Sequence, residues 1–177
     1  MLDLDRFVED CRTAAAADPT HKNVHEVVAR ALSDPSDVLA AVGEPTKGGI
    51  VPLYHADDLT ILNVIWKPGM TLRPHNHEMW AVIGVYGGRE DNIFWRRIKD
   101  APDGHIEAAG AQAMSTGDVS PLGKDVIHSV TNPIQKLTGA IHVYGGDFFG
   151  IHRSEWDPEH LTEQPYDIEK AKAAFLG

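Results

Sequence analysis

The chain has 177 residues, a formal net charge of −10 at pH 7, 42% hydrophobic residues and a single cysteine. This length suits one domain with a sizeable core, and the negative charge argues against nucleic acid or an anionic membrane as a partner. No apolar run approaches the roughly 18–20 residues of a membrane span. One cysteine excludes an internal disulfide, so we expect a cytoplasmic protein.

The first 45 residues are predicted to be helical. Apolar side chains recur at helical spacing over residues 3–17 and again over residues 21–32. Pro35 breaks this pattern, and a short third helix is expected from Ser36 to Val42 because Gly43 is a typical C-terminal cap. Cys11 falls on the apolar stripe of the first helix, so we interpret it as a packing residue and not as a nucleophile.

Residues 46–155 are rich in strand patterns separated by Gly and Pro turns, which favours a β-sandwich or barrel. Residues 89–92 indicate a hairpin loop, and a tail over residues 156–177 returns to helix from Ile168 to Phe175. The whole chain, residues 1–177, is predicted to be a single domain. Strands are expected near residues 50–54, 59–66, 77–86, 92–98, 105–108, 113–115, 126–131 and 138–145.

Two histidines, His75 and His77, occupy alternate positions of a predicted strand. Side chains at such positions share a face about 6–7 Å apart at Cα, which lets two imidazoles converge on one metal ion. A bare pair of this kind more often lies on an exposed strand. Here, however, Gly69 precedes the pair, and a distant His128 is followed four residues later by Asn132.

Together these residues resemble the two signature motifs of the cupin superfamily. The first motif, Gly-x5-His-x-His, matches Gly69 to His77, and the second, Pro-x-Gly followed by His-x3-Asn, matches Pro121 to Asn132 with a gap two residues longer than usual. The resemblance implies a mainly β fold, the cupin double-stranded β-helix, with N-terminal helices and a short C-terminal helical tail. It also implies metal ligation by His75, His77 and His128.

The ligand set differs from that of many cupins, which add a Glu three or four residues after the second histidine. Ala81 and Val82 occupy those positions, and Glu78 should point to the opposite face from His77. Three histidines without a carboxylate are what the thiol dioxygenases use. The chain therefore resembles the cysteine dioxygenase and 3-mercaptopropionate dioxygenase family.

A further segment supports this resemblance. Residues 141–144, Ile-His-Val-Tyr, are similar to the family's Ser-x-His-x-Tyr segment, which implies that His142 and Tyr144 form the catalytic pair. Tyr144 would then donate a hydrogen bond to bound substrate or oxygen, oriented by His142. Ala140 stands where the family has Ser. Ala81 stands where the mammalian-type enzymes carry a cysteine bound to the tyrosine, so that cross-link cannot form.

The substrate-binding residues stay open. The family directs an Arg from the strand before residues 59–66 onto the substrate carboxylate, but residues 49–55 contain no Arg. Lys47 and Arg73 are nearby cations. Arg96 or Arg97 is a further candidate because one of the two must face inward on a strand. Each of these is more often a solvated charge at the rim.

The resemblance implies an Fe(II) thiol dioxygenase that converts a small thiol to its sulfinic acid with O2. Imidazole ligands also suit Ni, Zn and Cu. One alternative is another metal-dependent cupin enzyme that acts on a non-thiol acid. The other is a non-catalytic cupin that binds a metal or a small ligand. A homodimer is one possible assembly.

Overall fold

Three helices open the chain in the computed structural model, which describes residues 2–176. They are α1 (Leu4–Ala17), α2 (Lys22–Ala31) and α3 (Pro35–Val42), close to the predicted ranges. Pro35 follows the end of α2 and is the first residue of α3, one residue earlier than the expected start at Ser36. Asp34 caps this helix by accepting a hydrogen bond from the Ser36 amide, and the first helical position needs no N–H from Pro35.

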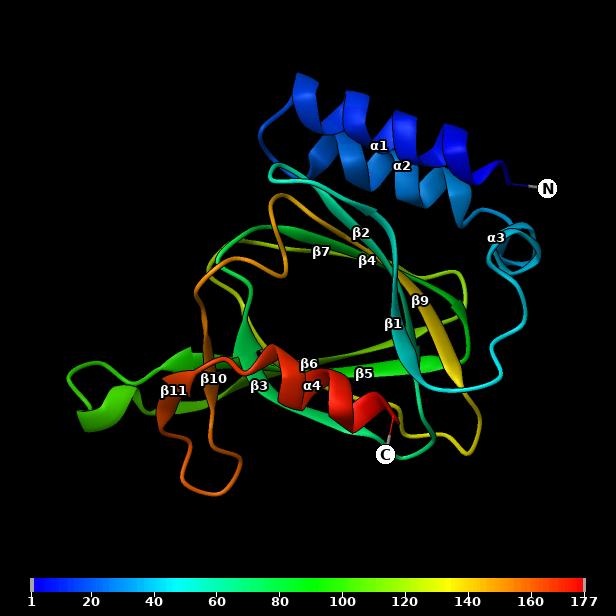
Figure 1. Cartoon of the computed structure of the whole chain (residues 1–177). Coiled ribbons are helices and arrows are strands. Elements are labelled where there is room, and N and C mark those ends of the chain that lie inside the picture. The colour runs from blue at the N-terminus through cyan, green and yellow to red at the C-terminus, as the bar shows by residue number, and fades with distance from the viewer. Residues whose placement is uncertain (1, 177) are drawn as a thin grey trace.

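The remainder is mainly β, in two antiparallel sheets that face each other (Figure 1). The first sheet has the order β1-β2-β9-β4-β7, comprising β1 (Gly49–His55), β2 (Thr60–Trp66), β9 (Thr138–Tyr144), β4 (Ala81–Gly87) and β7 (Val119–Leu122). The second has the order β11-β10-β3-β8-β5-β6, comprising β11 (Glu163–Pro165), β10 (Ser154–Trp156), β3 (Thr71–Asn76), β8 (Ile127–Thr131), β5 (Arg89–Arg97) and β6 (Ile106–Ser115).

The strand order is that of a double-sheet jelly roll. Strands β2, β9, β4 and β7 oppose β3, β8, β5 and β6. The chain crosses between the sheets after β2, β3, β4, β6, β7, β8 and β9. This is the architecture of two interlocked Greek keys that closes a barrel around an interior. The predicted double-stranded β-helix, with N-terminal helices and a C-terminal helix α4 (Ile168–Leu176), is confirmed.

Side chains of the first sheet alternate between two apolar layers, one inside the barrel and one between the sheet and the N-terminal helices. On β2, Leu62, Val64 and Trp66 belong to the cluster inside the barrel. Ile61 packs outward with Phe7 and the other apolar residues of α1 and α2, which lie side by side over this sheet (Figure 1). Side chains alternate across a strand, so one run of apolar residues serves both layers. Cys11 lies fully buried in the outer layer, as predicted.

Several strand boundaries differ from the prediction. The expected strand over residues 77–86 begins only at Ala81, as β4, because residues 77–80 form the connection from β3, where Glu78 adopts a positive φ of 55°. Residues 89–92 belong to β5 and not to a loop, since Gly88 alone makes the turn at φ 91°. Residues 105–108 and 113–115 fall within the single strand β6, and β7 lies where only a turn was expected.

None of the helices among residues 2–176 is long and apolar enough to cross a bilayer.

Gly88 provides a test of this turn. Its φ of 91° favours glycine, and a Cβ there would collide with Thr138, whose hydroxyl accepts from the Arg89 amide at 3.0 Å. We expect Gly88→Ala to lower the free energy of unfolding by about 1–3 kcal/mol. The neighbouring Gly87→Ala is the matched control, because a Cβ at Gly87 meets nothing within 4 Å. Equal urea midpoints for the two variants would contradict this account.

Candidate metal centre and ligand pocket

The structure brings the three predicted histidines together inside the barrel. His75 on β3 pairs in register with His128 on β8, and His77 follows directly after β3. One nitrogen from each ring lies within 4.8 Å of the others, and the two Nε2 atoms of His77 and His128 are 3.3 Å apart. Bonds of about 2.1 Å to one ion place ligand nitrogens roughly 3–3.5 Å apart. The cluster could therefore hold a metal ion.

The hydrogen bonds of two of these rings leave the correct nitrogen free for a metal. Nδ1–H of His75 donates to the Arg73 carbonyl at 2.9 Å, and Nδ1–H of His128 donates to Asn92 Oδ1 at 2.7 Å. Because carbonyl oxygens only accept, each Nε2 carries a lone pair. The buried Nδ1 of His77 has no hydrogen-bond partner among residues 2–176. The donor set thus fits a metal bound through three neutral imidazoles.

Burial keeps these rings neutral. Burial is the main reason that the pKa of His75 is lowered to about 3; the hydrogen bond to the Arg73 carbonyl opposes the shift, and the charge of Arg153 adds to it. Burial likewise lowers the pKa values of His77 and His128 well below the usual range, with the neighbouring histidines and Arg153 adding to the effect. Neutral imidazole is the form that binds metal, so no proton must leave these rings at neutral pH.

No carboxylate joins the three histidines among the residues that the structure describes. Glu78 instead accepts a hydrogen bond from Asn76 Nδ2 at 2.6 Å. Ala81 and Val82 are buried, the first in the inner apolar cluster and the second in the outer one. The absence of an acidic fourth ligand, expected from the sequence, therefore agrees with the geometry.

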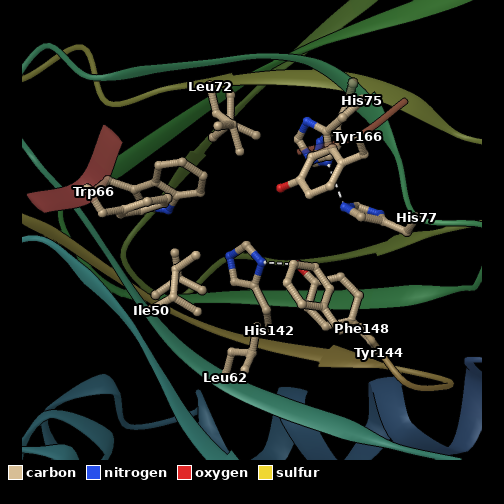
Figure 2. A pocket seen from close by; sticks show the side chains of 14 residues that line it. Ile50, Leu62, Trp66, Leu72, His75, His77, His142, Tyr144, Phe148 and Tyr166 are labelled. Carbon is tan, nitrogen blue, oxygen red and sulfur yellow. Dashed lines mark hydrogen bonds between the residues drawn. The ribbon is translucent and has the colours of Figure 1, made fainter. Parts of the chain in front are cut away.

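His142 and Tyr144 line the pocket across from His75 and His77 (Figure 2). Both project inward from β9, and Nδ1 of His142 lies 2.9 Å from the Tyr144 hydroxyl. The Tyr144 ring centroid is 5.0 Å from that of His77. Burial raises the pKa of Tyr144, which keeps the phenol protonated at neutral pH.

The pocket between the three-histidine cluster and the His142–Tyr144 pair is mainly apolar. Such a lining excludes water and strengthens the electrostatic interactions of the few polar groups inside. Two of its walls come from the C-terminal part of the chain, namely Tyr166 and Phe175. The other apolar lining residues are Ile50, Leu62, Val64, Trp66, Leu72, Val130 and Phe148.

Arg153, which the sequence analysis did not single out, is the cation beside this pocket. It is 8% exposed, and its Cζ lies 4.1 Å and 4.0 Å from the ring centroids of Phe148 and Tyr166. Nη1 and Nη2 have no hydrogen-bond partner within residues 2–176. Burial lowers the pKa of this guanidinium, and Tyr166 and Tyr144 oppose the shift. The two rings compensate this buried charge only in part, so the geometry is suited to an anionic ligand.

None of the four basic residues proposed from the sequence as carboxylate-binding candidates lines this pocket. Arg73 pairs with Glu155 at 3.2 Å, and Lys47 lines a separate hollow beside β1. Arg96 pairs with Glu107, and Arg97 with Glu163. Both arginines are exposed, so the prediction that one of them faces inward is wrong. The end of β5 pairs only with β6 at these positions, beyond the part of the barrel that encloses an interior.

The depressed histidine pKa values predict acid sensitivity of the metal-free protein. Above pH 6.5 the three rings are neutral in both states, so their contribution to stability is complete there. As the pH falls from 6.5 towards 3, the unfolded chain binds protons that the folded chain excludes. Each ring then lowers the free energy of unfolding by about 1.4 kcal/mol per pH unit.

Urea unfolding of metal-free protein between pH 7.5 and 5.5 measures this slope. His128→Gln should reduce it by about a third, because one of three such rings is removed. His105→Gln is the control, since His105 is exposed. A stability that does not change over this range would contradict the buried, neutral state of the cluster.

No family model matches the chain. Its fold is similar to that of a cupin family protein with a double-stranded β-helix fold from Methanocaldococcus jannaschii, at 10% identity and a TM-score of 0.47, over 59% of this chain and 84% of that one. A Klebsiella pneumoniae protein with a double-stranded β-helix domain gives 12% identity and a TM-score of 0.43, over 70% and 90% of the two chains. At these identities the similarity concerns the fold alone, which rests on the strand order described above.

Proposed function

We propose that this protein is an Fe(II)-dependent thiol dioxygenase that oxidises a small thiol bearing a carboxylate to its sulfinic acid with O2. The observation that carries the proposal is the buried guanidinium of Arg153 beside the three-histidine cluster, whose Nη1 and Nη2 make no hydrogen bond within residues 2–176. The His142–Tyr144 pair opposite the cluster is the second support, because it matches the arrangement expected from the family resemblance.

The buried charges support a ligand with two negative groups. Among the described residues, Glu90 and Arg153 are buried with opposite charges, and the buried Glu155 is paired with Arg73. A divalent cation at the histidines would therefore leave an excess of two positive charges in a low-dielectric interior. A thiolate together with a carboxylate would neutralise this excess, which is how buried charge is usually tolerated.

The residues have separate roles in this proposal. His75, His77 and His128 would hold the metal, which when bound would supply the redox chemistry and favour the thiolate form of the substrate. The planar fork of Arg153 would bind the carboxylate through two hydrogen bonds and so fix the distance of the sulfur from the cluster. The apolar walls would exclude bulk water.

Oxygen consumption and sulfinate formation across a panel of thiols, after anaerobic iron loading, test the activity. We expect turnover of thiols that carry a carboxylate and little turnover of matched thiols that lack it. Arg153→Met should raise KM for the carboxylate thiol by about 10–100-fold, in line with the loss of a charge-assisted bidentate contact. Arg96→Met, which removes an exposed arginine, is the matched control. Inactivity towards every thiol would refute the proposal.

Metal content tests the ligand assignment independently of turnover. We expect His75→Gln, His77→Gln and His128→Gln each to lose tightly bound metal, because three ligands are the minimum that such a site offers. His142→Gln should retain the metal, since His142 lies outside the cluster. Metal analysis of each purified variant measures this, and equal metal content in His128→Gln and the parent chain would contradict the assignment.

A second candidate is a metal-dependent enzyme that acts on a non-thiol acid. The same charge balance favours it, because a dicarboxylate also carries two negative groups towards Arg153 and the cluster. Turnover of a small dicarboxylate by a protein that is inert towards thiols would select this function. Tight binding of an acid without any turnover would instead indicate a ligand-binding protein.

A further inference from the structure

Glu90 is a fully buried glutamate on β5 whose two oxygens both accept hydrogen bonds. Oε2 accepts from Trp66 Nε1 at 3.0 Å, and Oε1 accepts from Asn92 Nδ2 at 3.2 Å. Neither the indole N–H nor the amide NH2 can accept in return. These contacts suit an ionised carboxylate whose position is fixed from two sides.

The same carboxylate faces His142. Nε2 of His142 lies 3.4 Å from Glu90 Oε2, a close charge contact, and this buried nitrogen makes no hydrogen bond to any residue in the range 2–176. A carboxylate opposite an imidazole nitrogen favours a hydrogen on that nitrogen. The other nitrogen, Nδ1, then has the lone pair. Since Nδ1 is 2.9 Å from the Tyr144 hydroxyl, Tyr144 must donate its hydrogen to His142.

We propose that Glu90 is a positioning residue that holds His142 in its Nε2–H tautomer and thereby directs the O–H of Tyr144 at His142. The Tyr144 oxygen then presents lone pairs to the pocket and acts there as a hydrogen-bond acceptor. This polarity matches a ligand group that carries hydrogen on oxygen or nitrogen. It differs from the donor role that the family resemblance implies for Tyr144.

Glu90 also orients His142 where a serine hydroxyl is missing, because Ala140 stands where the resembling family has Ser. Ala140, on the same strand as His142, has no polar side chain with which to fix the imidazole. Through Asn92, the glutamate reaches the metal cluster as well. Asn92 donates to Glu90 and accepts from His128, so the carboxylate fixes which way the amide points. One buried charge therefore orients side chains on both sides of the pocket.

The inference rests on the proposed function only for the identity of the ligand, and its test needs neither iron nor thiol. Long-range 1H–15N spectra of 15N-labelled, metal-free protein at neutral pH report the tautomer of each imidazole. We expect His142 in the Nε2–H form and His75 and His128 in the Nδ1–H form, as their carbonyl partners require. The His142→Gln variant assigns the signal. An Nδ1–H form of His142 in the parent protein would overturn the proposal.

Glu90→Gln tests the cause. Trp66, Asn92 and His142 all approach the carboxylate of Glu90, and a glutamine offers them only one acceptor oxygen. We therefore expect His142 in this variant to populate the Nδ1–H form as well as the Nε2–H form. Trp66→Phe is the matched variant, because it removes one hydrogen bond to Glu90 and keeps the carboxylate. There His142 should stay in the Nε2–H form.

A folded Glu90→Gln protein with an unchanged His142 tautomer would also overturn the proposal. If that variant does not fold, the parent protein and Trp66→Phe still decide the question. Loss of thiol oxidation with the expected tautomers would count against the proposed function alone, and the reverse result would count against the role of Glu90 alone.

Discussion

The burial of ionisable side chains in an apolar barrel is the constraint on which the rest of the structure depends. The three imidazoles of the metal cluster, the carboxylates of Glu90 and Glu155, and the guanidinium of Arg153 are among the side chains that lie where water cannot solvate them. Each must be neutral, paired or completed by a ligand, since an uncompensated charge in such an interior costs several kcal/mol. The histidines meet this requirement by staying neutral, and Glu90 meets it through its donors. Arg153 meets it in part by lying between the rings of Phe148 and Tyr166.

The alternation of side chains along each strand determines which residues face the pocket and which face the helices. The inward positions of β2 are apolar, whereas the inward positions of β9 end in His142 and Tyr144. The outward positions of the same strands pack against α1 and α2. The helices thus anchor the back of the sheet that carries the polar pair. A rigid sheet on each side of the pocket holds the two polar groups at a fixed separation.

The helices were predicted from local apolar periodicity, whereas the jelly-roll class and the convergence of His75, His77 and His128 were implied by the resemblance to the cupin motifs. The sequence did not predict that residues 89–92 form a strand. Four consecutive polar residues after Gly88 read as a loop, since periodicity arguments assume that inward strand positions are apolar. Glu90 is an exception to that assumption. Its buried carboxylate accepts hydrogen bonds from Trp66 and Asn92 inside the barrel.

Arg153 escaped prediction for a different reason. It lies in an irregular connection just before β10, where no periodicity indicates which side chains point inward. Its placement depends on two aromatic rings that are distant from each other in sequence, Phe148 and Tyr166. A backbone hydrogen bond of 2.9 Å from Tyr166 to Arg153 joins the two segments. Only the folded path of the chain brings these elements together.

Arg153 and Tyr166 come from a different part of the chain than the histidines of the pocket. The groups suited to chemistry lie on or next to strands of the jelly roll, whereas the groups suited to selecting a ligand come from the stretch after β9. Substitutions in that stretch would alter which molecules are accepted while leaving the histidine cluster intact. Under the proposed function, this arrangement would let a lineage exchange one acid for another by substitutions in the C-terminal wall, without a change in the histidine cluster.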